Sequence, residues 1–202
     1  MNKKIGLTFL TLLFICSTSF AARFQVDSAH TQIHFSVQHL VVFKVRGNFT
    51  DFTGIIEANP DNRTLISAAA TIQTASIDTR IEKRDQHLRS ADFFDASNHP
   101  QLHFKSKSIT GSGDNIIVLG EITIKGVTKE IMLQGSFLGT TAGPDGKLRA
   151  GFEATGMLNR KDFGLNWNKL TETGSVIVGD EIQIGLEIEA MIKPESMMST
   201  SG

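Results

Sequence analysis

Apolar and polar residues alternate in short segments along most of the chain. The clearest segment is at the C-terminal end, where Ile182, Ile184, Leu186 and Ile188 alternate with polar or small residues. Ile33, Phe35 and Val37 follow the same rule, as do Ile66, Ala68, Ala70 and Ile72. A period of two is typical of a strand with one buried and one solvated face. Further strands are predicted over 45–56, 102–108, 116–124, 131–138 and 148–158.

Turn-forming residues separate these segments. Gly, Pro, Asn and Asp gather at 59–62, 111–114 and 143–146, and Lys125-Gly126 is typical of a tight hairpin turn. Regularly spaced strands joined by hairpins predict an all-β antiparallel barrel or sandwich.

Two segments depart from the alternation. The charged segment 79–90 contains neither Gly nor Pro and predicts one short helix with Ile81, Arg84 or Asp85, and Leu88 on one face. Segment 159–167 is expected to contain a helical turn before Gly164. The single domain is expected to span 22–193, and the polar tail 194–202 is expected to be disordered.

The N-terminus predicts export. Lys3 and Lys4 precede an apolar run over 5–15, and small residues follow, so residues 1–21 are interpreted as a signal peptide cleaved before Ala22. The alternative, an uncleaved membrane anchor, is disfavoured because a spanning helix needs about 20 apolar residues. Cys16, the only cysteine, follows Ile15 rather than the small residue that lipidation requires, and it would leave with the signal.

Composition narrows the functional classes. Without Lys3 and Lys4, 18 basic residues face 21 acidic ones, and the chain has no basic run, so nucleic-acid binding is not expected. No second apolar stretch approaches 18 residues, which predicts a soluble mature protein that does not span a membrane. Fourteen Phe and no Tyr favour an apolar interior.

Motifs for catalysis and metal binding are weak. The chain has no Gly-x-Ser-x-Gly motif, and no Gly-rich turn has phosphate-binding spacing, so no catalytic residue and no cofactor are predicted. His30 and His34, like His99 and His103, are four residues apart, but four residues of strand span about 13 Å, too far for one ion. No metal site is predicted.

Two groups of polar residues leave alternatives open. His39 follows Val37 by two residues and is therefore expected on the same, apolar side of the strand. It is either a core histidine bonded to the backbone or a polar contact for a ligand head group in an apolar cavity. Arg84, Asp85 and His87 either contact an acidic head group at the rim of the barrel or belong to a solvated helix face, which is the commoner role of such a run.

Several motifs together resemble the YceI-like family of secreted bacterial polyisoprenoid-binding proteins. They are 35–40 (FSVQHL), 46–54 (RGNFTDFTG), 76–79 (SIDT), 84–95 (RDQHLRSADFFD), Pro100, Phe104, 120–129 (GEITIKGVTK), Gly151-Phe152 and 160–165 (RKDFGL). The resemblance implies an extended, lipocalin-like antiparallel barrel of eight strands with one or two short helices. The segment 166–178, which contains Trp167, matches no family pattern firmly.

The resemblance also implies a periplasmic carrier for a long apolar lipid, either an isoprenoid quinone precursor or a fatty amide. Parity and resemblance together predict a ligand-binding wall of Phe35, Val37, His39, Phe49, Phe52, Ile72, Phe104 and Phe152. Two alternatives remain: an enzyme acting on such a lipid with His39, Asp85 or His87 as acid or base, and a stress-response partner of a membrane redox protein. Whether the protein forms a homodimer is left open.

Overall fold

The computed structural model describes residues 21–40, 42–170 and 177–193. Most of them lie in antiparallel strands, with one α-helix, α1 (Glu82–Arg89), and two 3-10 turns, η1 (Thr74–Ser76) and η2 (Arg160–Phe163). The strands are β1 (Ala22–Val26), β2 (Gln32–His39), β3 (Phe43–Phe49), β4 (Phe52–Asn59), β5 (Thr64–Gln73), β6 (Ile77–Asp78), β7 (Gln101–Ser112), β8 (Asn115–Ile124), β9 (Val127–Ala142), β10 (Leu148–Asn159) and β11 (Val178–Ile192).

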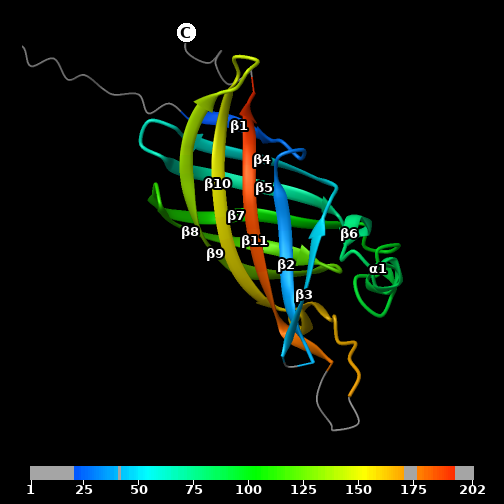
Figure 1. Cartoon of the computed structure of the whole chain (residues 1–202). Helices are drawn as coiled ribbons and strands as arrows, with labels where there is room; N and C mark the ends of the chain where they lie inside the picture. The colour runs from blue at the N-terminus through cyan, green and yellow to red at the C-terminus, as the bar shows by residue number, and fades with distance from the viewer. Residues whose placement is uncertain (1–20, 41, 171–176, 194–202) are drawn as a thin grey trace, which may run out of the picture.

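Eight of these strands close into a barrel. Their order is β1-β4-β5-β7-β8-β9-β10-β11, and β11 returns to β1 through the pair Phe24 and Ile192. The predicted all-β, eight-stranded antiparallel barrel is therefore confirmed. Figure 1 shows β9, β10 and β11 along the long axis, with β1, β4, β5 and β7 crossing behind them.

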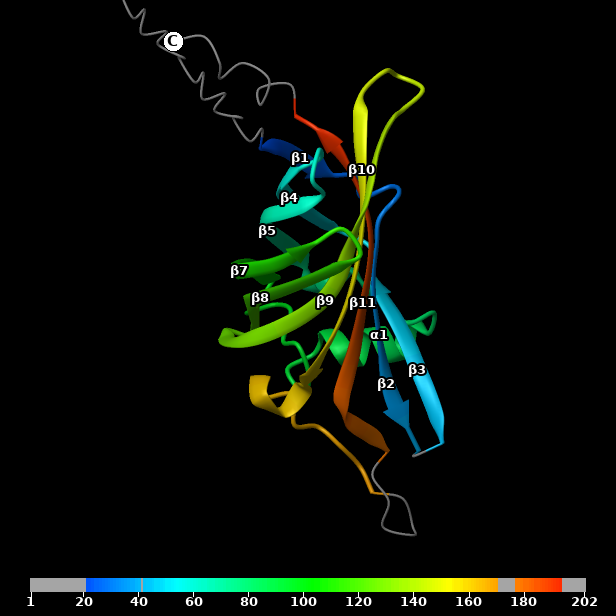
Figure 2. The same cartoon turned by 90° about the vertical axis from the view of Figure 1, so that its left-hand side faces the viewer.

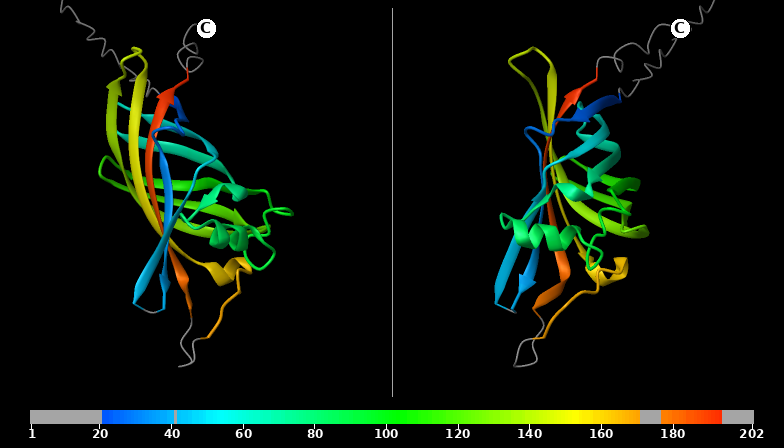
Figure 3. Two further views of the ribbon diagram at one scale, coloured as in Figure 1. Left: turned by 45° about the vertical axis from the view of Figure 1, so that its right-hand side comes forward. Right: turned by 90° about the vertical axis from the view of Figure 1, so that its right-hand side faces the viewer.

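β11 is long enough to have two neighbours on one edge. Its last residues pair with β1, whereas 178–187 pair with β2, which continues to β3 and β6. The β2–β3 hairpin therefore extends beyond the closed ring, as the view in Figure 2 shows. Figure 3 shows α1 beside this hairpin and η2 near the lower end of the barrel.

Alternation places the apolar face of each strand inside. Phe24 and Phe137 are fully buried, and Phe137 stacks on Phe152 with 4.4 Å between ring centroids. Phe24 meets Phe152 edge-on at 6.5 Å. This aromatic cluster fills one end of the barrel as a solid core and leaves the rest of the interior to other side chains.

The predicted turns and short helices are confirmed. Lys125 and Gly126 both adopt positive φ angles, 49° and 77°, as a two-residue hairpin turn between β8 and β9 requires. The segment 79–90 contains α1, although Ile81 is exposed instead of facing the core. η2 ends at Gly164, whose φ of 73° closes the turn.

Two strand predictions need correction. Segment 45–56 is two strands, because Thr50 and Asp51 leave the ladder to bond with Ser76 and Gln73. Ile66 is exposed, because a register shift opposite Glu57 and Ala58 places Leu65 on the inner face in its stead. β1 and β6 were not predicted.

Residues 1–20 of the predicted signal peptide (1–21) and the whole predicted tail, 194–202, lie outside the described residues. No helix in the described part of the chain is long and apolar enough to cross a bilayer.

Candidate ligand cavity

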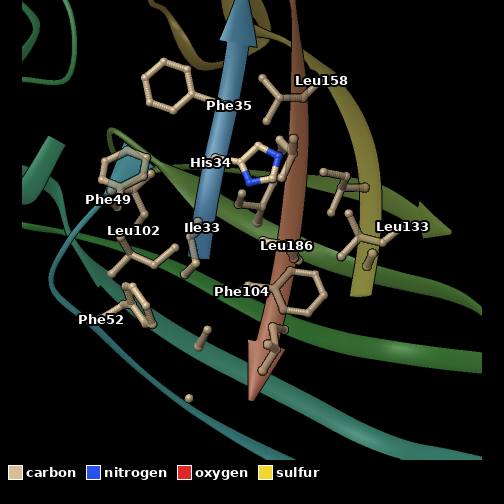
Figure 4. Close-up of a pocket in the computed structure, with 18 of the residues that line it drawn as sticks. Ile33, His34, Phe35, Phe49, Phe52, Leu102, Phe104, Leu133, Leu158 and Leu186 are labelled. Atoms are coloured by element: carbon tan, nitrogen blue, oxygen red, sulfur yellow. The ribbon is translucent and has the colours of Figure 1, made fainter. Parts of the chain in front are cut away.

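The barrel encloses a cavity of about 250 Å³ beyond the Phe24–Phe137–Phe152 cluster. Its wall is almost wholly apolar and draws on β1 to β5 and β7 to β11. Figure 4 shows side chains from several of these strands converging on one space, with Phe52, Phe104 and Leu186 around it. Phe35 and Phe49 touch within the wall, with 5.8 Å between ring centroids. An apolar wall built from many strands suits a flexible hydrocarbon better than a polar substrate.

Seven of the eight predicted wall residues surround this cavity. Phe35 and Val37 reach it from β2 because they are paired with Ile184 and Ile182, the inward residues of β11. The others are Phe49, Phe52, Ile72, Phe104 and Phe152. Whether any of them contacts a ligand stays a prediction.

His39 keeps the predicted parity but lies farther along β2. It is half-buried, pairs with Phe43 on β3 and Val178 on β11, and is not one of the residues around the cavity. It follows Val37 on the same face, where the hairpin leaves the barrel. A head-group contact at His39 would therefore lie outside the enclosed space.

α1 and the loop after it close one side of the cavity. Leu88, Phe93 and Phe94 belong to the wall, and Phe94 meets Phe49 edge-on at 6.1 Å. The sequence placed this helix near the mouth of the barrel, but the contribution of Phe93 and Phe94 to the wall was not predicted, although the FF pair in an otherwise charged segment was a signal for it.

Arg84 and Asp85 hold the start of α1 in place. The buried Asp85 carboxylate accepts hydrogen bonds from the backbone N–H of Thr79 at 3.0 Å and from its hydroxyl group. Arg84 donates to the hydroxyl and the carbonyl oxygen of Thr79, both at 2.7 Å. Both side chains are therefore committed to the junction between β6 and α1, which favours a structural role over a head-group contact.

His87 joins α1 to the chain after η2. Its ring meets Trp167 edge-on at 4.7 Å and Phe93 at 5.1 Å, and its Nε2 is 2.9 Å from a carboxylate oxygen of Asp92. Trp167 also packs against Phe93 at 5.2 Å. Since Phe93 belongs to the cavity wall, His87 lies behind that wall.

Arg160 anchors the irregular segment around Trp167. Its buried guanidinium donates to the carbonyl oxygens of Leu165, Trp167 and Gly179, and it forms an ion pair with Asp180 at 3.2 Å. Burial lowers the pKa of Arg160, and the neighbouring Asp180 opposes that shift. Arg160 lies in one of the motifs that carry the family resemblance, but the sequence predicted no role for it. In the unpredicted segment 166–178, residues 171–176 lie outside the described residues.

His34 lies in the wall between the cavity and the outside. It belongs to the residues around the cavity and also to those around a polar hollow on the outer surface, with its ring against Gly185 of β11. The alternation of Ile33, Phe35 and Val37 would place His34 on the solvated face only.

Asp27, His30 and Glu189 bring three potential metal ligands within 4.8 Å of one another. The carboxylate of Asp27 lies 2.9 Å from Nδ1 of His30, and this hydrogen bond lowers the pKa of Asp27 and raises that of His30. Glu189 is paired with Arg149 at 2.9 Å. The guanidinium of Arg149 and the imidazole of His30 thus each have a carboxylate partner, and these side chains form an ion-pair network.

Fold and cavity define the class of the protein: an eight-stranded antiparallel barrel that encloses an apolar cavity and is closed at one side by a short helix. Residues 24–190 match the YceI-like domain, and the chain belongs to this family.

Relatives support the assignment over most of the chain. The chain is 38% identical over 168 residues to Protein YceI of Escherichia coli, and the alignment covers 82% of this chain and 88% of that protein. The crystal structure of a Campylobacter jejuni YceI protein is 34% identical, with a TM-score of 0.67 over 77% of this chain and 90% of that one.

A polyisoprenoid binding domain from Saccharophagus degradans has the same fold. Its TM-score is 0.64 over 84% of this chain and 98% of that chain, at 13% sequence identity. At this identity the likeness concerns the fold.

Proposed function

We propose that the protein is a periplasmic carrier that encloses the chain of a long apolar lipid, an isoprenoid or a fatty amide, in its barrel. The observation that carries the proposal is the enclosed cavity with its apolar wall. The mechanism is passive enclosure, so the protein is a binding protein and not an enzyme.

The chemistry of the cavity suits a slender apolar chain, and its volume takes part of such a chain. At about 250 Å³ it is just smaller than the roughly 300–1,000 Å³ of most small-molecule sites. Each buried methylene contributes about 0.8 kcal/mol, so a few prenyl units supply enough free energy to offset the cost of association. Affinity then comes from the chain and needs few polar contacts.

Arg84 and Asp85 at the rim are bonded to Thr79 and are therefore committed to the fold, which suits a binding protein. His87 is bonded to Asp92 and packs behind the cavity wall. Among the relatives, the domain from Saccharophagus degradans is described as polyisoprenoid-binding, which is consistent with an isoprenoid as the cargo.

The proposed location rests on the sequence of residues 1–21. β1 begins at Ala22, directly after the predicted cleavage site, so cleavage there would remove no strand of the barrel. A carrier is needed in an aqueous compartment between membranes, where a free prenyl chain is insoluble.

Native mass spectrometry tests the carrier proposal. Residues 22–202 would be incubated with solanesol, a long prenyl alcohol, or with oleamide, a fatty amide, and then separated from free lipid. We expect a one-to-one complex with at least one of them, and the arm that gives it identifies the lipid class. A folded protein that retains neither lipid, and that carries none when purified from its own source, would contradict the proposal.

A further inference from the structure

The barrel wall has an incomplete seam between β5 and β7, on the side away from the β2–β3 hairpin (Figure 2). The ladder of this seam covers only 69–73 and 101–105, although both strands continue. The segments 64–68 of β5 and 106–112 of β7 therefore border a gap in the hydrogen-bonded wall, which we call the window. Ala69, beside the window, is exposed and also belongs to the residues around the cavity, so the cavity lies close to the outer surface there.

A β-bulge on each strand lies where the two strands part. Ile66 is an extra residue of β5 in its pairing with β4, and Lys107 is an extra residue of β7 in its pairing with β8. A bulge bends its strand and can end pairing. At the same level, the backbone N–H of Ala68 donates to the hydroxyl group of Ser106 at 3.0 Å instead of to a carbonyl oxygen. The separation of the strands is therefore built into both of them.

The inner side chains along the window are less covered than their neighbours in the sheet. Leu65, Ala68 and Ile109 are half-buried, and the first two belong to the cavity wall. Ile56, which pairs with Ala68 from β4, and Val118, which pairs with Ile109 from β8, are both only 5% exposed. The window therefore leaves the apolar lining of the cavity partly uncovered.

Arg63 closes the far end of the window. Its carbonyl oxygen accepts a hydrogen bond from the N–H of Gly113 at 2.9 Å, and its Nε donates to the carbonyl oxygen of Phe137 at 2.7 Å. Its guanidinium also pairs with Asp114. These bonds hold Arg63 at a φ of 53°, which is uncommon for a long side chain. At about 3.3 Å per residue, β5 spans about 20 Å from Arg63 to Ala69, enough for a slender chain to lie along the window.

Two other sides of the cavity are closed by fixed structure. The aromatic cluster around Phe137 fills one end of the barrel. Phe93 and Phe94 close the side at α1, and the buried Asp85 anchors the start of that helix. Entry at either side would require packed side chains to move, whereas at the window the strands are already parted.

We propose that the window is the portal through which an apolar chain enters and leaves the cavity, and that Arg63 limits how far it opens. The lipid as cargo rests on the proposed carrier function, whereas access to the cavity does not. A chain that passes between Leu65 and Ile109 meets apolar side chains on both strands. Because a portal affects the barrier and not the bound state, a change in it should alter the rates of uptake and release equally and leave the affinity unchanged.

A reversible disulfide across the seam tests the portal. The variant is Ala69→Cys/Lys105→Cys in residues 22–202, which contain no other cysteine. These two residues are the last pair of the ladder and both are exposed, and the spacing of directly opposed residues suits a disulfide. The readout is stopped-flow fluorescence with phenylnaphthylamine, an apolar dye. We expect uptake and release to be about tenfold or more slower in the oxidised than in the reduced protein, because the disulfide prevents the window from widening.

The matched control is Leu119→Cys/Met132→Cys. These residues are also exposed and directly paired, but they lie in the continuous seam between β8 and β9, so their disulfide should leave both rates unchanged. Equal rates in the oxidised and reduced seam variant would overturn the portal, and so would equal slowing in the control or a wild-type protein that the dye does not enter.

Arg63→Met tests the limit on opening. Loss of the guanidinium should raise both rates by about fivefold, the factor that one lost hydrogen bond corresponds to, at unchanged affinity. Arg149→Met is the control, because Arg149 forms ion pairs with Asp145 and Glu189 away from the window and should change neither rate. A change in affinity without matched changes in both rates would overturn this role of Arg63.

Solanesol retention separates the portal from the carrier function. The wild type and the reduced seam variant should both retain solanesol in native mass spectrometry. If neither retains it while the disulfide still slows the dye, the portal holds and the carrier function fails. If both retain it and the disulfide has no effect on the rates, only the portal is overturned.

Discussion

Filling the cavity from its wall should weaken lipid binding without harming the fold. Ala70 lies on β5 between Gly54 and Phe104 in the sheet register, and it belongs to the cavity wall. The substitution Ala70→Leu adds three carbon atoms to this wall. If each displaces one methylene of the lipid, at about 0.8 kcal/mol per methylene, the loss is about 2.4 kcal/mol, or about fiftyfold in affinity.

An exposed alanine elsewhere in the barrel supplies a matched control. Ala142 is exposed at the end of β9 and is not one of the residues around the cavity, so Ala142→Leu adds the same carbon atoms away from it. Its affinity for the lipid should equal that of the wild type. The assay is fluorescence titration of Trp167, the only tryptophan, which packs against Phe93 of the cavity wall.

Urea unfolding completes this experiment. Overpacking a filled core costs about 1–3 kcal/mol, whereas a leucine that enters an open cavity should leave the free energy of unfolding nearly unchanged. An Ala70→Leu protein that is folded and binds with wild-type affinity would refute the reasoning, and so would an equal loss in Ala142→Leu.

Three other perturbations test the supporting structure. Arg160→Met should lower the free energy of unfolding in urea by about 3 kcal/mol, because several carbonyl oxygens lose their donor, whereas the more exposed Lys161→Met should cost about 0.5 kcal/mol. Asp85→Ala should cost about 2 kcal/mol in the same assay, because it leaves a buried backbone N–H without an acceptor, and an unchanged midpoint would rule out its anchoring role. The pKa of His30 is raised and that of Asp27 lowered in the folded protein, so this pair should stabilise the fold most between about pH 4 and 6.5. Its contribution is lost as pH rises through the folded pKa of His30 or falls through that of Asp27, and NMR titration that finds both pKa values at their ordinary positions would contradict this.

The inner faces of the strands could be predicted from the sequence because one side of each strand is dry. Phe35 and Val37, like Ile182 and Ile184, keep the period of two and line the cavity. Ile66 escaped the rule because a bulge shifts parity locally, and its cause lies in the pairing with β4, not in the local pattern.

Positions along a strand were harder to predict than faces. His39 has the parity of Val37, but β2 is longer than the cavity, so its side chain lies beyond it. The position of a residue relative to a cavity depends on how strands from distant parts of the chain are staggered, which parity does not reveal. Arg160 was missed for a similar reason, since most of its acceptors follow η2 in an irregular segment.

Photo-crosslinking tests most directly whether the lipid chain lies in the barrel. A prenyl lipid with a diazirine at the end of its tail would be bound, irradiated and mapped by peptide mass spectrometry. The account predicts crosslinks to wall residues such as Phe35, Phe104 and Leu133. Crosslinks confined to exposed residues of the outer surface, such as Met132 and Met157, would contradict it.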